Sequence, residues 1–309
     1  ASWTNNGTLT LTGGTYTFNG AATQNINPGA TNTYNAVSIS NTTNPGVVLA
    51  TNGINVAAGL ALAANARADM GGNATGATLT HTISAAITNA GYWTTSNCNF
   101  VFNTGNQTIP PNDAVTPGTS FTSRSITCIT ATKTLGAHLT CENLTINSGA
   151  ALAASATPFN VNVSGNWTNN GTFTNSSNTV TFNGSTAINP NVTITAGAST
   201  FYNVSFSPSS AVSYSLATAS TSITNNTTIG SNATLNLNTN SLTIGRNANV
   251  TKTITVNGTL YINENSRLLF DNRGGATAQC QMTVTGSSAL LRIVGTNNAN
   301  VATISRVAA

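Results

Sequence analysis

The chain contains 309 residues, and Asn, Thr, Ser and Gly together account for 160 of them. Only 5% of the residues are charged, against roughly 25% in an ordinary soluble domain. The formal charge of +4 comes from nine dispersed basic residues, which does not support nucleic-acid binding. Because acids, bases and metal ligands are so scarce, we expect no catalytic, cofactor-binding or metal-binding residues and no enzyme activity.

Short segments along the chain alternate a small polar residue with an apolar one. This period of two, carried by β-branched and aromatic residues, is typical of strands with one buried face. Glu, Lys, Gln and Met are too rare for extended helices. The pattern therefore predicts a folded all-β chain and argues against disorder. In chain order the segments are TLTLT (8–12), TYTF (15–18), INVAAGLAL (54–62), TVTF (179–182), TLNLN (234–238), TITV (253–256) and TLYI (259–262).

An internal repeat organises the chain. The segment WTNNGTLTLTGGTYTFNG at 3–20 returns as WTNNGTFTNSSNTVTFNG at 167–184, and a weaker copy begins at Trp93. We interpret residues 1–309 as a single domain of three irregular repeat units, about 3–92, 93–166 and 167–309. The aromatic residues expected to mark the core of these units are Trp3, Trp93, Trp167, Phe18, Phe102 and Phe182.

The repeat pattern predicts a parallel β-solenoid. Short strands broken by Gly and Asn turns cannot bury their apolar face alone, whereas stacked coils bury a continuous core. A solenoid also tolerates irregular coil lengths, because extra residues leave the coil as loops. At roughly 20 residues per coil, the chain would form about 15 coils. Tandem β-sandwiches are the alternative, although no Pro-rich or charged linker separates the units.

Several strings in the chain resemble the repetitive β-helix segments of large bacterial secreted and surface proteins, including adhesin-like and autotransporter-like passengers. These strings are WTNNGTF, TVTFNG, FYNVSF and ITVNGTLYI, and the resemblance covers most of the chain. The resemblance implies a right-handed parallel β-helix, secretion and a role at the cell surface. It carries over no catalytic residue. The chain begins at Ala1 without a basic and apolar leader, which fits a mature secreted product.

The cysteines and the N-x-S/T sequons bear on such an extracellular location. Cys128 and Cys141 lie in successive strand-like segments and are candidates for a disulfide, with four buried unpaired thiols as the alternative. Glycosylation is compatible with secretion, but the sequons are about as frequent as chance predicts for an Asn-rich chain. The candidate glycosylation sites are Asn6, Asn41, Asn170, Asn191, Asn226 and Asn257.

Two groups of residues suggest an enzymatic site, and for both we favour a structural interpretation. Glu264 and Asp271 lie seven residues apart beside Arg267, which is the spacing of a small carboxylate–arginine site or of surface ion pairs. His81 and His138 lie in strand-like segments without a nearby serine or cysteine nucleophile. We expect the acids to form surface ion pairs and the histidines to be structural.

Two further patterns suggest ligand binding. Asp69 lies in a Gly-rich turn, RADMGGNATG, but a calcium site would need more than one acid. Threonine strings resemble the ladders with which some ice-binding proteins order water, although Thr is also the preferred small residue on exposed strand faces. The threonines of these strings are Thr8, Thr10, Thr12, Thr251, Thr253 and Thr255.

The two ends of the predicted solenoid lead to a functional hypothesis. Neither end of the sequence contains a polar amphipathic cap, although open coil ends carry unpaired backbone groups. We therefore expect an extracellular structural protein whose coils stack end to end on other copies of itself, giving a filament or sheath at the cell surface. The alternatives are a monomeric adhesin or carbohydrate-binding segment, and then a polysaccharide-acting enzyme or an ice-binding protein. No run of 18 apolar residues is present, so we expect no membrane span.

Overall fold

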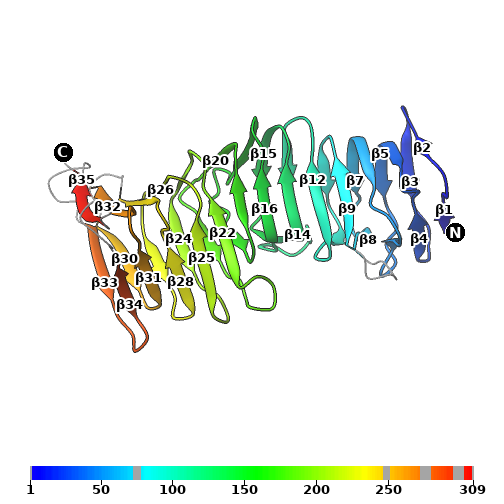
Figure 1. Ribbon diagram of the computed structural model, residues 1–309. Helices are drawn as coiled ribbons and strands as arrows, with labels where there is room; N and C mark the ends of the chain where they lie inside the picture. Colours follow the sequence, from blue (N-terminus) through cyan, green and yellow to red (C-terminus); the bar gives the residue numbers. More distant parts are fainter. Residues whose placement is uncertain (1, 72–77, 246–250, 272–279, 295–302, 308–309) are drawn as a thin grey trace. The chain divides into compact units, whose positions relative to one another are not determined.

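In a computed structural model of the protein, parallel β-sheets stack into a β-solenoid of about 11 turns (Figure 1). The structure describes residues 2–71, 78–245, 251–271, 280–294 and 303–307. These residues form strands and loops without helices, which confirms the predicted all-β solenoid. The strand pairs run parallel, whereas β-sandwiches are built from antiparallel sheets, so tandem sandwiches are the wrong fold.

The coils are longer and fewer than predicted. Residues paired on neighbouring coils are 19 positions apart for Leu79 and Cys98, but 36 apart for Arg267 and Thr303. The estimate of about 15 coils assumed a uniform short coil, and loops of variable length account for the difference.

The chain divides into two compact units. The first unit comprises Ala1–Cys141 and Thr145–Ser155, and the second comprises Glu142–Leu144 and Ala156–Ala309. The strand β16 (Leu139–Ile146) contributes residues to both. The division into three repeat units at residues 93 and 167 stays a prediction from the sequence.

The first unit is built from short strands that each pair with the strand of the next coil. One of its sheets has the order β1-β4-β6-β8-β11, and each of these strands is two to four residues long. The other strands of this unit pair in the same parallel manner. The strands are β1 (Trp3–Thr4), β2 (Leu9–Thr10), β3 (Thr15–Phe18), β4 (Gln24–Asn27), β5 (Asn32–Ile39), β6 (Val47–Leu49), β7 (Asn55–Leu62), β8 (Arg67–Asp69), β9 (Leu79–Ile83), β10 (Ile87–Asn89), β11 (Tyr92–Thr94), β12 (Cys98–Phe102), β13 (Gln107–Ile109), β14 (Phe121–Cys128), β15 (Ala131–Leu135) and β17 (Ala150–Ala153).

The second unit repeats this architecture. One sheet has the order β23-β26-β29-β32-β35, and the strands from β18 to β34 outside this sheet, except β20, pair coil by coil. The strands are β18 (Val161–Val163), β19 (Trp167–Asn169), β20 (Thr172–Thr174), β21 (Thr179–Phe182), β22 (Asn191–Thr195), β23 (Thr200–Phe201), β24 (Asn203–Phe206), β25 (Val212–Leu216), β26 (Ser220–Ile223), β27 (Thr227–Ile229), β28 (Ala233–Asn236), β29 (Ser241–Ile244), β30 (Lys252–Val256), β31 (Thr259–Ile262), β32 (Arg267–Asp271), β33 (Cys280–Val284), β34 (Leu290–Ile293) and β35 (Thr303–Val307).

The alternating sequence pattern becomes two kinds of side-chain column in the second unit. Because successive residues of a strand point to opposite faces, in-register stacking sorts apolar and small polar residues into separate columns. One inward column consists of Val163, Phe182, Phe206, Ile229, Val256 and Val284. The adjacent outward column consists of Asn162, Thr181, Ser205, Thr228, Thr255 and Thr283.

Asparagine side chains connect successive coils. The amide of Asn32 donates to the carbonyl of Gly53 (3.0 Å), and its Oδ1 accepts from the backbone N–H of Asn55 (3.1 Å). In the second unit, Asn225 donates directly to Oδ1 of Asn203 (2.7 Å). These bonds satisfy polar groups at the turns and explain the high Asn content without invoking an active site.

The aromatic residues expected to mark the repeats have different environments. Trp93 and Phe102 in the first unit, and Trp167 and Phe182 in the second, are at most 3% exposed. Ring centroids of Trp93 and Phe121 lie 5.5 Å apart, and those of Trp167 and Phe201 lie 5.2 Å apart, both edge to face. Trp3 and Phe18, on the outermost coil, are only half-buried.

Candidate functional site

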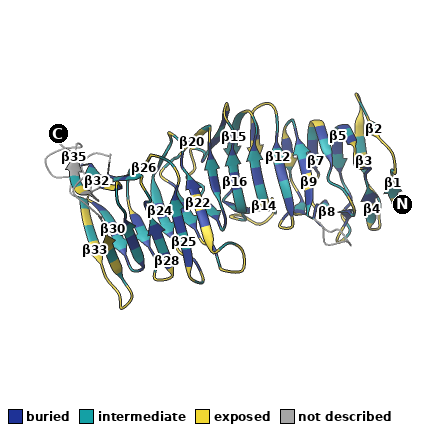
Figure 2. Cartoon of the chain, viewed as in Figure 1, coloured by how far each residue is buried: buried dark blue, intermediate teal, exposed yellow. Residues whose placement is uncertain are grey.

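The last described coil of the second unit leaves core side chains uncovered. Along the inward column that ends at Val284, the five preceding residues are at most 2% exposed, whereas Val284 is 43% exposed. Ile293 is 51% exposed beside its fully buried partner Ile262, and Ile304 is 39% exposed on the strand next to Leu268. The strand β33 accordingly carries exposed residues in Figure 2. The core of this unit therefore continues to the last coil without a cap among the described residues.

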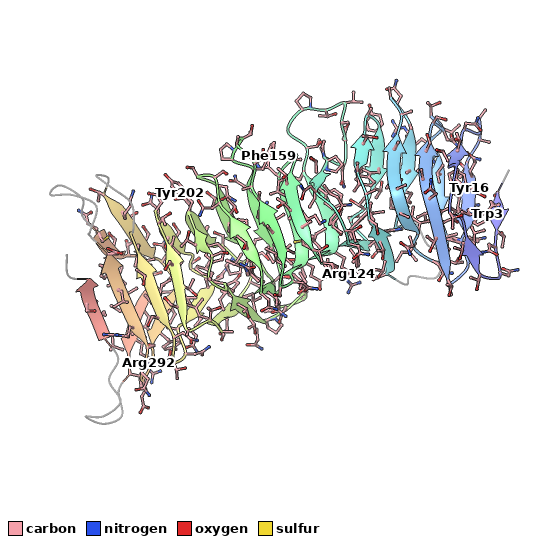
Figure 3. The ribbon with its side chains drawn as sticks, turned by 90° about the horizontal axis from the view of Figure 1, so that it is seen from above. Trp3, Tyr16, Arg124, Phe159, Tyr202 and Arg292 are labelled. Atoms are coloured by element: carbon pink, nitrogen blue, oxygen red, sulfur yellow. The ribbon has the colours of Figure 1, made fainter. Side chains whose placement is uncertain are left out.

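The first coil shows the same feature at the beginning of the chain. Trp3, Tyr16 and Phe18 are half-buried, whereas their partners on the second coil, Ile26, Val37 and Ile39, are at most 3% exposed. Trp3 and Tyr16 lie on the outermost strands of the first unit in Figure 3. Their rings pack edge to face on Tyr34, with centroid distances of 6.1 and 5.6 Å. This coil thus presents an aromatic, partly covered core surface.

The described strands of the first and last coils also have one unpaired backbone edge each. Of the described strands, β1, β2 and β3 each pair with the second coil on one side. The strands β33, β34 and β35 likewise pair only with the preceding coil. Each end therefore offers three strand edges with N–H and C=O groups available to a further parallel strand.

A polar groove lies on the outer face of the first unit, along β8 and β11. Its volume is about 280 Å³, and its floor consists of strand residues that point away from the core. The parallel pairing places Tyr92 beside Arg67, and Thr94 beside Asp69. The groove is lined by Asn44, Pro45, Arg67, Ala68, Asp69, Tyr92, Trp93, Thr94, Asn112 and Asp113.

One rim of the groove is a turn that requires glycine, and the other rim is held by hydrogen bonds. On one side, Gly46 has φ +79, and a Cβ there would lie 2.3 Å from the carbonyl oxygen of Arg67, so only glycine fits the turn. On the other side, the indole N–H of Trp93 donates to the carbonyl of Pro111 (3.0 Å), and Oδ1 of Asn112 accepts from the Thr95 hydroxyl (2.9 Å). Tyr92 forms an antiparallel bridge with Asp113.

Three charged side chains meet in this groove. The Arg67 guanidinium lies 4.4 Å from the centroid of the Tyr92 ring, a cation–π contact. Asp113 accepts backbone N–H bonds from Val115 (2.8 Å) and Thr116 (3.0 Å). Hydrogen bonding from the Thr116 side chain, together with these backbone bonds and the positive charge of Arg67, holds the pKa of Asp113 below its usual range. Asp69 accepts from the N–H of Gly71 (3.2 Å).

The structure does not bring the thiols of the candidate disulfide together. The N–H of Asn147 donates to the carbonyl of Cys128 (2.9 Å), so Cys128 lies beside the end of β16. Cys141 lies near the start of that strand, and at about 3.3 Å per residue the two cysteines are roughly 15–20 Å apart along it. A disulfide needs Cα atoms within about 7 Å, so this register excludes the bond.

The sequons differ in accessibility. Asn41 is fully buried, and its amide donates to the Ala22 carbonyl (2.8 Å) and to Gln24 (3.0 Å), so it cannot carry a glycan in the folded protein. Asn257 is half-buried. The exposed sites are Asn6, Asn170, Asn191 and Asn226.

The structure separates the residues of the suggested enzymatic sites. Glu264 precedes β32, whereas Asp271 is the last residue of that strand and is 1% exposed, so roughly 13 Å of strand lie between Arg267 and Asp271. His81 is fully buried on β9 and bonded to backbone atoms of Ile54 and Met70. The arrangement does not place Glu264 and Asp271 as a facing carboxylate pair.

The threonine strings form ladders of limited extent. Thr10 lies beside Thr33 in the first unit, and Thr255 lies between Thr228 and Thr283 in the second. Each ladder is interrupted along its strands by asparagine and glutamine neighbours, as Thr253 beside Gln281 illustrates. Ice binding stays a prediction.

The described residues form a parallel β-solenoid with partly exposed core side chains on its first and last coils and a charged groove on the first unit. Comparisons of the chain with protein-family models, with curated proteins and with solved structures found no match. In the part of the chain that the structure describes, no helix is long and apolar enough to cross a membrane. Across the same residues, no three His, Cys, Asp or Glu side chains gather closely enough to hold a metal ion.

No short motif of the sequence indicates the groove. Its charged residues come from separate coils, with Arg67 and Asp69 preceding Tyr92 by one coil and Asp113 following in a loop. One feature of the sequence does indicate this position: residues 1–66 contain no charged side chain, and the first two charged residues, Arg67 and Asp69, then occur close together.

Proposed function

We propose that this protein is an extracellular structural subunit that polymerises head to tail, the last coil of one copy stacking on the first coil of the next. The observation that carries the proposal is the uncovered core at the last coil, where Val284, Ile293 and Ile304 continue buried columns yet are 39–51% exposed. A second coil placed on these side chains would contribute roughly 1 kcal/mol for each, about half of the value for full burial.

The first coil of a second copy has the features needed to cover this surface. It presents three strand edges, β1, β2 and β3, to the three edges of β33, β34 and β35. It also supplies Trp3, Tyr16 and Phe18 as apolar partners. Residues 1–66 contain no charged side chain, so the incoming end brings no charge to bury or repel.

Such a contact joins two different surfaces, and a heterologous interface that does not close into a ring produces an open polymer. The uncharged amide and hydroxyl exterior supports an extracellular fibre, because its hydration does not depend on salt. The surface location is tested by labelling intact and permeabilised cells of the source organism with an antibody against the protein. Labelling only after permeabilisation would contradict it.

The assembly is tested by sedimentation over a wide concentration range combined with negative-stain microscopy. Wild-type protein is expected to form filaments, whereas Ile293→Lys should remain monomeric because it places a charge in the joint. Ile188→Lys is the matched control, since Ile188 is 48% exposed in a loop between β21 and β22 and lies away from the end strands. Circular dichroism verifies that both variants fold.

Mixing the proteins tests the polarity of the polymer. Ile293→Lys keeps an intact first coil, so it should add to a filament and block further growth, shortening wild-type filaments at substoichiometric amounts. Monomers at every concentration would overturn the proposal. Closed dimers that do not grow, or filaments unaffected by Ile293→Lys, would overturn the head-to-tail arrangement.

A further inference from the structure

The polar groove of the first unit concentrates charge in a chain that otherwise has little. Arg67, Asp69 and Asp113 line one groove of about 280 Å³, although charged residues make up only 5% of the chain. The Arg67 guanidinium contacts the Tyr92 ring, but no hydrogen-bond acceptor of the described residues lies on its five N–H donors. Its side chain is half-buried, so the guanidinium lies at the groove floor with N–H donors available to a ligand.

The carboxylates also have unused bonding capacity. The backbone N–H bonds of Asp69 and Asp113 all go to Oδ1, so each carboxylate, with about four lone-pair sites, keeps acceptor capacity for a ligand. The groove therefore combines acceptors from two carboxylates with donors from one guanidinium. Charge-assisted hydrogen bonds of this kind are about twice as strong as neutral ones.

We propose that this groove binds a neutral polysaccharide. Each sugar hydroxyl both donates and accepts a hydrogen bond, so neighbouring hydroxyls match a carboxylate oxygen beside a guanidinium. The net charge of the three side chains is −1, which disfavours an anionic glycan, while Arg67 disfavours a metal ion or a basic peptide.

The size and rigidity of the groove fit one or two sugar units of a longer chain. Its volume lies just below the range of about 300–1,000 Å³ that encloses a drug-sized molecule, so a polymer would extend beyond it. On one rim the Thr95 hydroxyl holds Asn112, and beside the other rim the turn at Gly46 has a backbone conformation that only glycine fits. A preformed site avoids the entropy cost of ordering loops on binding.

The groove is tested with the full chain by affinity electrophoresis in gels containing mannan, dextran, galactan, a β-glucan or the polyanion polygalacturonate. We expect saturable retardation by at least one neutral polysaccharide. Asp69→Asn and Arg67→Gln should each raise the half-saturating concentration about tenfold or more, the effect of losing a hydrogen bond to a charged group.

Arg124→Gln is the matched control, because Arg124 is an exposed arginine of the same unit on β14 and lies outside the groove lining. It should leave binding unchanged. The control and both groove variants are compared in the Ile293→Lys background, which is expected to be monomeric, so that each molecule presents one groove to the polysaccharide. The inference is overturned if no neutral polysaccharide retards the protein, if only polygalacturonate does, or if both groove variants, shown to be folded by circular dichroism, bind like wild type.

Discussion

The buried histidine of the first unit makes its stability depend on pH in a predictable way. His81 is fully buried on β9; the N–H of Ile54 donates to its Nδ1 (3.2 Å), and its Nε2 lies 2.9 Å from the Met70 carbonyl oxygen. Burial lowers the pKa of His81 to about 4 from its ordinary 6.5, and the Met70 carbonyl opposes this only in part. The folded unit therefore keeps His81 neutral at pH values where the unfolded chain protonates it.

The size of the effect follows from the two pKa values. Because the folded pKa is the lower one, stability is lost as pH falls below 6.5, and the loss levels off below pH 4. Between pH 7 and 4.5 the folded unit should lose about 2 kcal/mol, and below pH 4 the total should approach about 3 kcal/mol. The other titratable groups interfere little in this range, because the chain has only five carboxylates and two histidines.

Native-state hydrogen exchange of the Ile54 amide measures this loss directly, since that N–H bonds to the imidazole. After correction for intrinsic exchange, its protection factor should fall about 30-fold between pH 7 and 4.5. In His81→Asn this fall should disappear, although the variant should be destabilised by about 1–3 kcal/mol at pH 7 because a buried group loses its partner. The matched variant of the other histidine, His138→Asn, should retain the fall. Protection independent of pH in wild type, or an equally steep fall in His81→Asn, would refute the reasoning.

Three further predictions concern cysteine reactivity and packing. Maleimide should label Cys280 in the native protein but Cys98 only after denaturation, because Cys98 is fully buried and burial raises the pKa of its thiol. Labelling is read by peptide mass spectrometry, and equal labelling rates of the two cysteines in the native protein would contradict this prediction. Gly53→Ala should lower the thermal midpoint of the first unit, since a Cβ there would lie 1.8 Å from the Thr80 carbonyl oxygen. Gly13→Ala is the control, because a Cβ at Gly13 has open space and should leave the midpoint unchanged. Equal midpoints of the two variants in calorimetry would refute the packing argument. Tyr214→Phe should destabilise the second unit by about 1 kcal/mol in urea denaturation, because the Tyr214 hydroxyl donates a hydrogen bond to the Phe182 carbonyl (3.1 Å). A variant as stable as wild type would show that this bond contributes nothing to stability.

The fold was predictable because the alternation of side chains is a local property. Segments such as TVTF and TITV place small polar and apolar residues on opposite faces whatever the neighbouring coils are, and the structure aligns them into columns. The number of coils was not predictable to the same degree, because loops between strands change length without changing the strand pattern. Trp3 and Phe18 are half-exposed because they lie on the first coil, whereas the matching Trp167 and Phe182 are buried. The two copies of the repeat have similar sequences, so the sequence could not reveal this difference.

Features that depend on register between coils could not be derived from the sequence. Cys128 and Cys141 lie in successive strand-like segments of the sequence, but the register in which β14 pairs with β16 places them far apart along the strands. The groove likewise exists because β11 pairs with β8 at Tyr92 and Arg67, and because the loop through Asp113 folds back on β11. A shift of one residue would turn Arg67 toward the core, so this site rests on a register that no short motif encodes.

The low charge of the chain bears directly on how it could assemble. Copies that stack end to end form the same joint again at every subunit, so each charge near a joint recurs once per subunit and is partly desolvated there. Residues 1–66 avoid this cost, because they contain no charged side chain. Near the opposite end, Arg292 lies over the Tyr261 ring (5.5 Å), on an exposed face that is not part of the core columns (Figure 3). Salt should consequently have little effect on the critical concentration for assembly, since no ion pair is needed at the joint. A critical concentration that rises tenfold between 50 mM and 500 mM salt in sedimentation would show that charges hold the joint, and would exclude apolar core continuation as its principal cause.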